Sequence, residues 1–296
     1  MQTIHHQYCP VCNSTELTPV HRCKDFYVSG ETFWIARCEH CGFLFTQNVP
    51  SAAFIGNYYH SETYISHSDT QKGFMNKLYH LTRRYMLKSK RQKIERYTDK
   101  RGKLLDYGTG TGYFSNEMKQ NGWQVTAIEK DGPSRQFAKT KFGIEVLDET
   151  ALSTLPNNAF DVITLWHVLE HVEDLHSVLD HLHRLLNNGL LVLALPNHTS
   201  FDAKHYQDDW AAFDVPRHLW HFSPDTLSKL LDNHGFRIEK IHPMPLDAFY
   251  VSILSEKYKC HRPALLKGML IGLSAWFASL TDKTKSSSLI YIIRKK

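Results

Sequence analysis

The 296-residue sequence has no internal repeat, no low-complexity segment and no uninterrupted stretch of 20 apolar residues. These absences argue against a repeat protein and a disordered chain. Residues 1–8 lack the apolar run that a secretory signal needs, so we expect a cytoplasmic protein. With 42% hydrophobic and 22% charged residues, the composition is that of a globular protein long enough for one large domain and a small module.

The longest apolar stretch, residues 264–280, is marginal as a membrane span. It has only 17 residues, and Lys267, Gly268 and Gly272 interrupt it, whereas a span needs about 20 apolar residues. We expect a helix packed on the core or at a dimer interface, with the oligomeric state left open. The alternative is peripheral contact with an anionic membrane, which the basic approach over residues 257–262 would suit.

Cysteine is scarce, and four of the six cysteines form two C-x-x-C pairs: Cys9, Cys12, Cys38 and Cys41. Two such pairs predict a structural zinc site with four thiolate ligands, and residues 26–37 are expected to form strand between them. Cys23 or His21 could replace a missing ligand. The alternative is two redox or incidental pairs. Cys260 is expected to be an ordinary thiol.

Three glycines lie at alternate positions in the segment Leu-Leu-Asp-Tyr-Gly-Thr-Gly-Thr-Gly over residues 104–112. The pattern predicts a buried strand, a glycine loop and then a helix, which is the context of a nucleotide-type site. The spacing is G-x-G-x-G, and Asp106 would repel a pyrophosphate but suit an ammonium group. Glu129 ends the next strand, where a carboxylate can accept both ribose hydroxyls. S-adenosylmethionine, which has both groups and no phosphate, fits better than NAD.

These motifs, together with the segment Phe-Asp-Val-Ile-Thr-Leu-Trp-His-Val-Leu-Glu-His-Val over residues 160–172, resemble those of class I S-adenosylmethionine-dependent methyltransferases. The branch is the one that includes ubiquinone-biosynthesis-like enzymes. The resemblance covers about residues 100–242 and the final strand. It implies an α/β fold with a Rossmann-like, doubly wound sheet of seven mostly parallel strands, the last inserted antiparallel, and a helical insertion before it.

The resemblance also implies roles for single residues. The methionine end of the cofactor would be held by the loop residues Asp106, Gly108, Thr109, Gly110 and Gly112. Glu129 would hold the ribose, and Asp148 or Glu149 the adenine. Trp166 and His167 would flank the cofactor where the acceptor arrives. His171 is itself a candidate for the base, although in this branch of the family the position more often has a packing role.

A polar and aromatic segment, residues 209–223, follows the fifth strand and resembles one in zinc-module methyltransferases of surface-polysaccharide and secondary-metabolite pathways. We expect substrate recognition there. Its candidates are His218 and His221 as bases, Arg217 for an acceptor carboxylate or phosphate, and Trp210. The alternative is that the segment only packs a lid and caps the next helix through residues 223–225.

Three regions are expected: a zinc-ribbon-like module over residues 1–48, a linker and basic helical lead-in over 49–101, and the methyltransferase domain over 102–296. Residues 72–103 contain twelve Lys or Arg and two acidic residues, a net charge of +10, and residues 72–97 are expected to form a helix. The expected strands of the main sheet are 103–106, 123–129, 143–147, 160–166, 189–195, 236–242 and 288–293.

The sequence therefore predicts a methyltransferase acting on a small-molecule acceptor of the sugar, lipid-linked or secondary-metabolite type. An RNA methyltransferase, gripping RNA with the zinc module and basic helix, is the first alternative. No Asn-Pro-Pro-Tyr-type motif, which would support this alternative, follows the fourth strand. Trp166 and His167 lie there instead. A non-catalytic scaffold is the second, against which the intact glycine loop argues.

Overall fold

The computed structural model describes residues 3–59, 74–259 and 263–296. Its centre is a seven-stranded sheet in the order β12-β13-β10-β9-β6-β7-β8. All neighbouring pairs are parallel except those that β13 makes with β10 and β12. The predicted fold class, with its antiparallel last strand, is confirmed. The strands are β6 (Lys103–Tyr107), β7 (Gln124–Ile128), β8 (Val146–Leu147), β9 (Phe160–Trp166), β10 (Leu186–Pro196), β12 (Phe236–Pro243) and β13 (Ser288–Lys295).

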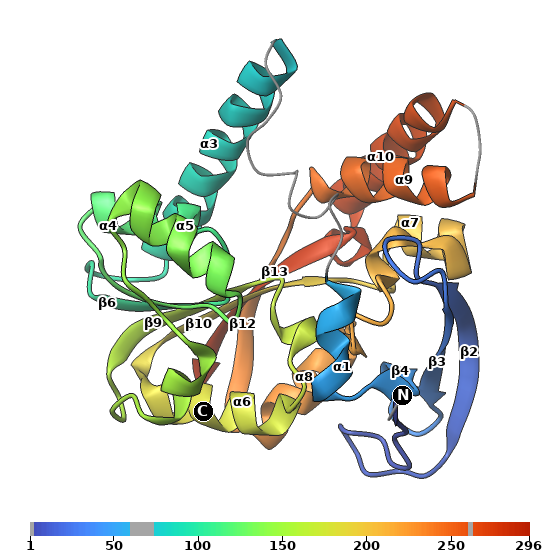
Figure 1. The fold of residues 1–296 in the computed structure, drawn as a ribbon, viewed down its shortest axis with the longest axis horizontal. Helices are drawn as coiled ribbons and strands as arrows, with labels where there is room; N and C mark the ends of the chain where they lie inside the picture. Colours follow the sequence, from blue (N-terminus) through green and yellow to red (C-terminus); the bar gives the residue numbers. More distant parts are fainter. Residues whose placement is uncertain (1–2, 60–73, 260–262) are drawn as a thin grey trace.

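Helices cover both faces of this sheet (Figure 1). Successive strand residues point to opposite faces, so Leu104 joins one apolar cluster and Leu105 the other. Residues of α3 and α4 share the cluster of Leu104, whereas residues of α6 and α8 share that of Leu105. The helices around the sheet are α3 (Phe74–Glu95), α4 (Tyr113–Gln120), α5 (Gly132–Phe142), α6 (Leu175–Leu185) and α8 (Pro224–Asn233).

A second sheet is built from the N-terminal region and has the order β11-β4-β3-β2. Its strand β11 (Trp220–His221) comes from the segment after β10 and pairs with β4. The boundary predicted at residue 48 stays a prediction, but the two regions share this sheet. The other elements here are β1 (Thr3–Ile4), β2 (Leu17–Lys24), β3 (Thr32–Cys38), β4 (Leu44–Gln47), β5 (Val49–Pro50) and α1 (Ala52–Ile55).

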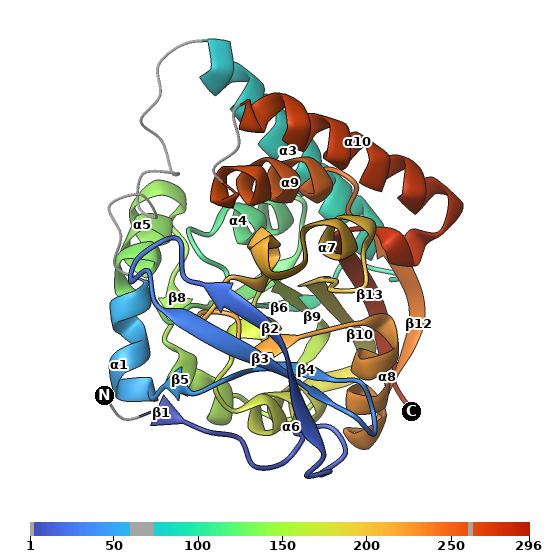
Figure 2. The ribbon, with the colours of Figure 1, turned by 90° about the vertical axis from the view of Figure 1, so that its right-hand side faces the viewer.

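A helical insertion separates β12 from β13, as predicted. It is a hairpin of α9 (Asp247–Tyr258) and α10 (Ala264–Thr281), with α10 on the outside (Figure 2). The short helix α7 (Phe201–Tyr206), which follows β10, lies against the same hairpin.

Several predicted boundaries were wrong. Residues 26–37 do not form one strand, because the Asp25 carboxylate accepts N–H bonds from Tyr27, Val28 and Ser29 and closes a turn before β3. The strand predicted at 143–147 is only β8, since Gly143 caps α5 in a left-handed conformation. Strand β10 begins at Leu186, three residues earlier than predicted. The predictions for Cys260 and for the first two residues of the basic helix lie outside the described residues.

Candidate active site

The glycine loop lies at the carboxyl end of β6 and leads into α4. Its glycines Gly108, Gly110 and Gly112 all have positive φ, at 74°, 56° and 80°. A Cβ at Gly108 would lie 2.3 Å from a methyl of Val168, and one at Gly112 would lie 2.8 Å from Cβ of Ala138. A Cβ at Gly110 would meet no atom of residues 3–59, 74–259 and 263–296 within 4 Å. Gly108 and Gly112 therefore permit close packing, whereas Gly110 borders open space.

The side chain of Asp106 fixes the glycine loop through hydrogen bonds and does not face the open space beside Gly110. Its carboxylate is buried and accepts hydroxyl bonds from Thr109 at 2.7 Å, Ser115 at 2.8 Å and Thr164 at 2.8 Å. Burial raises the pKa of Asp106 despite these three donors. The geometry gives Asp106 and Thr109 a positioning part in this site. Direct contact of either side chain with a ligand stays a prediction.

Glu129 and Asp148 lie at the same edge of the sheet, after β7 and β8. Glu129 accepts the backbone N–H of Gly110 at 2.7 Å and that of Asp131 at 2.9 Å, so its carboxylate lies beside the loop. Asp148 caps the following 3-10 turn and pairs with Arg135 at 2.9 Å. The hydrogen bonds from Thr150 and the charge of Arg135 lower the pKa of Asp148.

His167 follows β9 at this edge, in a left-handed backbone conformation with φ of 58°. Such a conformation is uncommon for a residue other than glycine and is often found at functional sites. Its imidazole lies 3.3 Å from Glu170 and 3.5 Å from Asp247 of α9. Burial alone would lower the pKa of His167, but these two carboxylates raise it to about 9. At neutral pH His167 is therefore a cation paired with these two carboxylates.

Trp166 lies one residue earlier and is covered by Lys90 of α3. The Lys90 ammonium lies 4.1 Å from the centre of the indole ring, a cation–π contact. Burial lowers the pKa of Lys90 to about 8, although the charges of Asp247 and Asp106 oppose the shift. The indole N–H of Trp166 is buried and has no hydrogen-bond partner among the residues that the structure describes. The Lys90 amine, with a pKa of about 8, thus lies against Trp166 and interacts with the charges of Asp106 and Asp247.

Sequence reasoning missed Lys90, Asp247 and Glu170. Lys90 is one of twelve cations in the basic segment, and the sequence does not distinguish it from the other eleven. Asp247 lies in a helix that begins 80 residues after His167. Glu170 was part of the quoted motif, and an acid three residues after a histidine was the one signal that could have singled it out.

The imidazole rings of His171 and His218 contact each other, with ring centres 4.5 Å apart. Nδ1 of His171 bonds the carbonyl of Arg217 at 3.0 Å, and Nδ1 of His218 bonds that of Ala212 at 2.8 Å. Burial, helped by the nearby His218, lowers the pKa of His171 to about 4. A group with this pKa is a weak base, so the geometry favours a packing role for His171.

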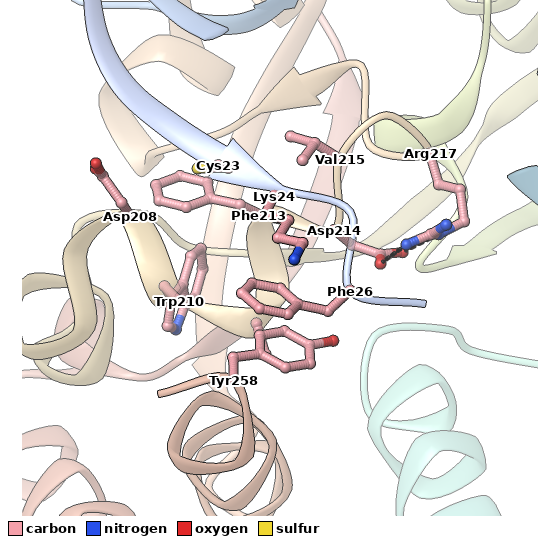
Figure 3. A pocket seen from close by; sticks show the side chains of 11 residues that line it. Cys23, Lys24, Phe26, Asp208, Trp210, Phe213, Asp214, Val215, Arg217 and Tyr258 are labelled. Carbon is pink, nitrogen blue, oxygen red and sulfur yellow. Dashed lines mark hydrogen bonds and ion pairs between the residues drawn. The ribbon is translucent and has the colours of Figure 1, made fainter. Parts of the chain in front are cut away.

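The segment after β10 packs against the N-terminal sheet, which accounts for its unusual composition. Arg217 is buried, and it pairs with Asp214 at 2.6 Å and Asp25 at 3.1 Å (Figure 3). Trp210 is only 2% exposed and donates its indole N–H to Asp202 at 2.8 Å. His221 contacts the Thr46 hydroxyl at 2.9 Å, and burial lowers its pKa well below the usual range. These contacts favour the alternative in which the segment packs a lid.

The small pocket in Figure 3 lies in this interface, lined by β2, the segment after α7 and the end of α9. Phe26 and Tyr258 stack across it with ring centres 4.1 Å apart. The pocket does not include the glycine loop, Glu129, Trp166 or His167. It therefore belongs to the packing between the N-terminal sheet and the helical hairpin.

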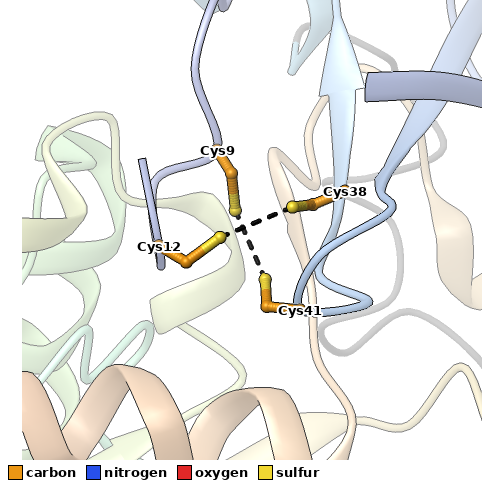
Figure 4. Close-up of side chains that lie close together, drawn as sticks. All are labelled: Cys9, Cys12, Cys38 and Cys41. Carbon is orange, nitrogen blue, oxygen red and sulfur yellow. Dashed lines mark hydrogen bonds between the residues drawn. The ribbon is translucent and has the colours of Figure 1, made fainter. Parts of the chain in front are cut away.

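The four predicted cysteines converge near the N-terminal sheet (Figure 4). The sulfur atoms of Cys9 and Cys41 are 3.5 Å apart, as are those of Cys12 and Cys38, and all four lie within 4.8 Å of one another. A tetrahedral ion with Zn–S bonds of about 2.3 Å has sulfur atoms roughly 3.8 Å apart. The cluster fits such an ion. Cys23 lies outside it, in β2.

Comparison with known proteins gives the fold and the site an assignment. A family model described as a methyltransferase domain matches residues 79–241, which are 163 of the 296 residues. The chain belongs to this methyltransferase family. The matched region contains the glycine loop, the carboxyl ends of β6 to β9 and the whole Lys90–Trp166–His167 cluster. Residues 79–241 are thus a methyltransferase domain.

Curated relatives support this methyltransferase assignment over part of their length. An uncharacterized methyltransferase of Alkaliphilus oremlandii is 34% identical over 112 residues, covering 36% of this chain and 50% of that protein. A ubiquinone biosynthesis O-methyltransferase of Paramagnetospirillum magneticum is 32% identical over 103 residues, covering 33% and 41%. The chain thus spans about half the length of the curated relatives it matches.

A solved methyltransferase supports the fold. The 1,6-didemethyltoxoflavin-N1-methyltransferase of Burkholderia thailandensis superposes with a TM-score of 0.50 at 15% identity, covering 93% of this chain and 100% of that one.

The residues at the sheet edge fit S-adenosylmethionine in two respects. The open space beside Gly110 admits a ligand against the backbone, and Glu129 ends β7 where ribose hydroxyls can be accepted.

Proposed function

We propose that this methyltransferase transfers a methyl group to a hydroxyl of a small-molecule acceptor bound beside Lys90, Trp166 and His167. The observation that carries the proposal is Lys90, an amine with a pKa of about 8 at the carboxyl end of β9. A general base is most effective when its pKa is near the working pH. Bound S-adenosylmethionine would supply an electrophilic methyl group on its sulfonium.

The residues of the cluster divide the remaining tasks. Lys90 in its neutral form would accept the proton of the acceptor hydroxyl. His167, held protonated by Glu170 and Asp247, would place a positive charge beside the acceptor. Trp166 offers an aromatic face that excludes water from one side. The O-methyltransferase among the relatives supports an oxygen acceptor.

The structure supports the RNA alternative less well. Cations of the basic helix are partly neutralised, since Arg91 pairs with Glu95 at 2.7 Å and with Glu117 at 2.9 Å, and Glu95 also pairs with Arg101. Lys90 is turned toward Trp166. Arg91 and Lys90 are therefore engaged within the protein and are less available to phosphates.

The first experiment is calorimetric titration of the purified chain with S-adenosylmethionine and S-adenosylhomocysteine, followed by an acceptor screen. Binding of both at micromolar concentration is expected. The screen would contain phenols, sugar nucleotides, lipid-linked sugars and a short RNA, with release of S-adenosylhomocysteine as the signal. Methylation of the RNA alone would contradict the small-molecule proposal, and absence of cofactor binding by a folded chain would favour the scaffold.

We further propose that the four-cysteine cluster holds a structural zinc ion. Four thiolates complete a tetrahedral site, so no position is left for a substrate or water. The cluster joins two chain segments, one before β2 and one after β3, and its sulfurs are continuous with the apolar core that includes Phe43 and Phe45. The ion would therefore stabilise the N-terminal sheet. It would also stabilise residues 209–223, whose strand β11 pairs with that sheet.

Replacing Cys38 with serine should remove the metal and lower the unfolding temperature, because three thiolates hold zinc far less tightly than four. Zinc would be measured by mass spectrometry on the purified protein, together with thermal unfolding. Cys23→Ser is the matched control, since Cys23 is also buried but lies outside the cluster. One equivalent of zinc in Cys38→Ser would show that the ligand set is wrong.

A further inference from the structure

The outer face of α10 is apolar over its whole length. Seven large side chains on it are 39–66% exposed: Leu265, Leu266, Met269, Leu270, Leu273, Phe277 and Leu280. Their spacing places them on one side of the helix. Within the described part of the chain, α10 is the one helix long and apolar enough to cross a membrane. This face is covered by no other described element.

The inner face of α10 carries small residues instead. Gly268, Gly272, Ala275 and Ser279 are buried. A Cβ at Gly268 would lie 2.5 Å from Cα of Ile253, and one at Gly272 would lie 2.8 Å from Cα of Phe249, so α9 and α10 are in backbone contact. A surface helix in water buries its large apolar residues and exposes polar ones. The arrangement in α10 is the reverse and is typical of helices that face lipid.

Residues 264–285 carry three lysines and one acidic residue, Asp282, and so have a net charge of +2. Residues 264–281 contain no Asp or Glu, and Lys267 lies exposed in the first turn. Lys283 and Lys285 follow the helix and are also exposed. Lysine side chains of this kind bind anionic headgroups while their methylene stems lie along apolar surface. The charge pattern thus complements an anionic bilayer.

The surroundings of α10 favour a helix lying on the bilayer rather than spanning it. Its inner face is fixed to α9, whose Asp247 and Glu256 have partners inside the protein, His167 and Tyr206. Helix α3 reaches the same end of the molecule (Figures 1 and 2) and exposes Leu81 and Tyr85. An interfacial helix needs an apolar face and a cationic rim, and both are present here.

We propose that the outer face of α10 binds the surface of a bilayer that contains anionic lipid. The contact would be linked to the active site through α9, because Asp247 at its first turn contacts His167. An acceptor carried by a lipid would then be delivered to the end of the molecule where α9 begins. Bilayer binding itself does not depend on the proposed methyl transfer.

The test is flotation of the full-length protein with vesicles of phosphatidylcholine alone or with about 30% phosphatidylglycerol. We expect flotation with the anionic vesicles, and a partition coefficient at least about tenfold lower for the double variant Leu266→Glu/Leu270→Glu. Ile4→Glu/Val28→Glu, at two exposed apolar positions of the N-terminal region, is the matched control and should float like the wild type. Lys283→Gln should weaken binding by about fivefold.

Three results would overturn the proposal. The first is a wild-type protein that floats with neither vesicle, and the second is a double variant that floats as well as the wild type. The third is a wild-type dimer, by light scattering, that Leu266→Glu/Leu270→Glu converts to a monomer while vesicles bind neither form, which would assign the face to a second copy. Calorimetry with S-adenosylhomocysteine on the same samples separates loss of vesicle binding from misfolding and from failure of the proposed function.

Discussion

Gly110→Val is expected to abolish measurable binding of S-adenosylmethionine while the protein stays folded. A Cβ at Gly110 would meet no atom of the described residues within 4 Å, so the valine side chain would start in the space beside the loop. If the cofactor fills that space, its affinity should fall by about a hundredfold or more, since forcing groups into filled space costs about 1–3 kcal/mol and displacement of the ligand adds to this. Calorimetry would measure the change, with Gly110→Ala expected to give an intermediate loss.

Gly143 provides the matched control for this prediction. It has nearly the same backbone conformation, with φ of 60°, and a Cβ there also meets no atom within 4 Å. Both valine variants should therefore lose similar stability, about 1–2 kcal/mol from the left-handed backbone. Only Gly110→Val should lose the cofactor. Wild-type affinity in Gly110→Val would place the cofactor elsewhere.

The central sheet and the cysteine cluster could be predicted because their signals are local. The buried strands of the sheet are short apolar runs, the glycine loop is continuous in sequence, and each C-x-x-C pair spans one turn. The edge at which Glu129 and Trp166 meet the loop follows from parallel strands, whose carboxyl ends share one side of a sheet. Each of these inferences needs only spacing and the topology of β-α-β units.

The contacts made by residues 209–223 could not be predicted in the same way. Arg217, Trp210 and His221 have the composition of a substrate site, yet their partners are Asp25, Asp202 and Thr46. Arg217 and Asp25 are separated by 192 residues, and no local pattern records that they pair. A buried ion pair and a ligand-binding arginine are alike in sequence, because both require a cation beside polar and aromatic residues. For Lys90 the error is the opposite one: the sequence indicated a basic helix, but not that one of its lysines is directed at the site.

Lys90→Met should reduce turnover by about 10²–10⁴-fold with little change in cofactor affinity. The estimate is the usual contribution of a general base. Because the ammonium of Lys90 loses its proton near pH 8, the wild-type rate should rise with pH through about 8 and then level off. In Lys90→Met this limb of the pH profile should disappear. Lys90→Arg keeps the positive charge over Trp166 but cannot act as a base at these pH values, so it should be equally slow.

Lys88 supplies the control, because it lies on the same helix, two residues earlier, and is exposed. Lys88→Met removes the same charge from α3 and should keep both the rate and the pH profile. The titration of Lys90 can also be followed without an acceptor, by the pH dependence of its acetylation measured by mass spectrometry, for which a midpoint near pH 8 is expected. A Lys90→Met enzyme with the wild-type rate and an unchanged pH profile would remove Lys90 from the proton transfer. If Lys90→Arg were instead active, the lysine would serve through its charge over Trp166, as a positioning residue for the acceptor rather than as its base.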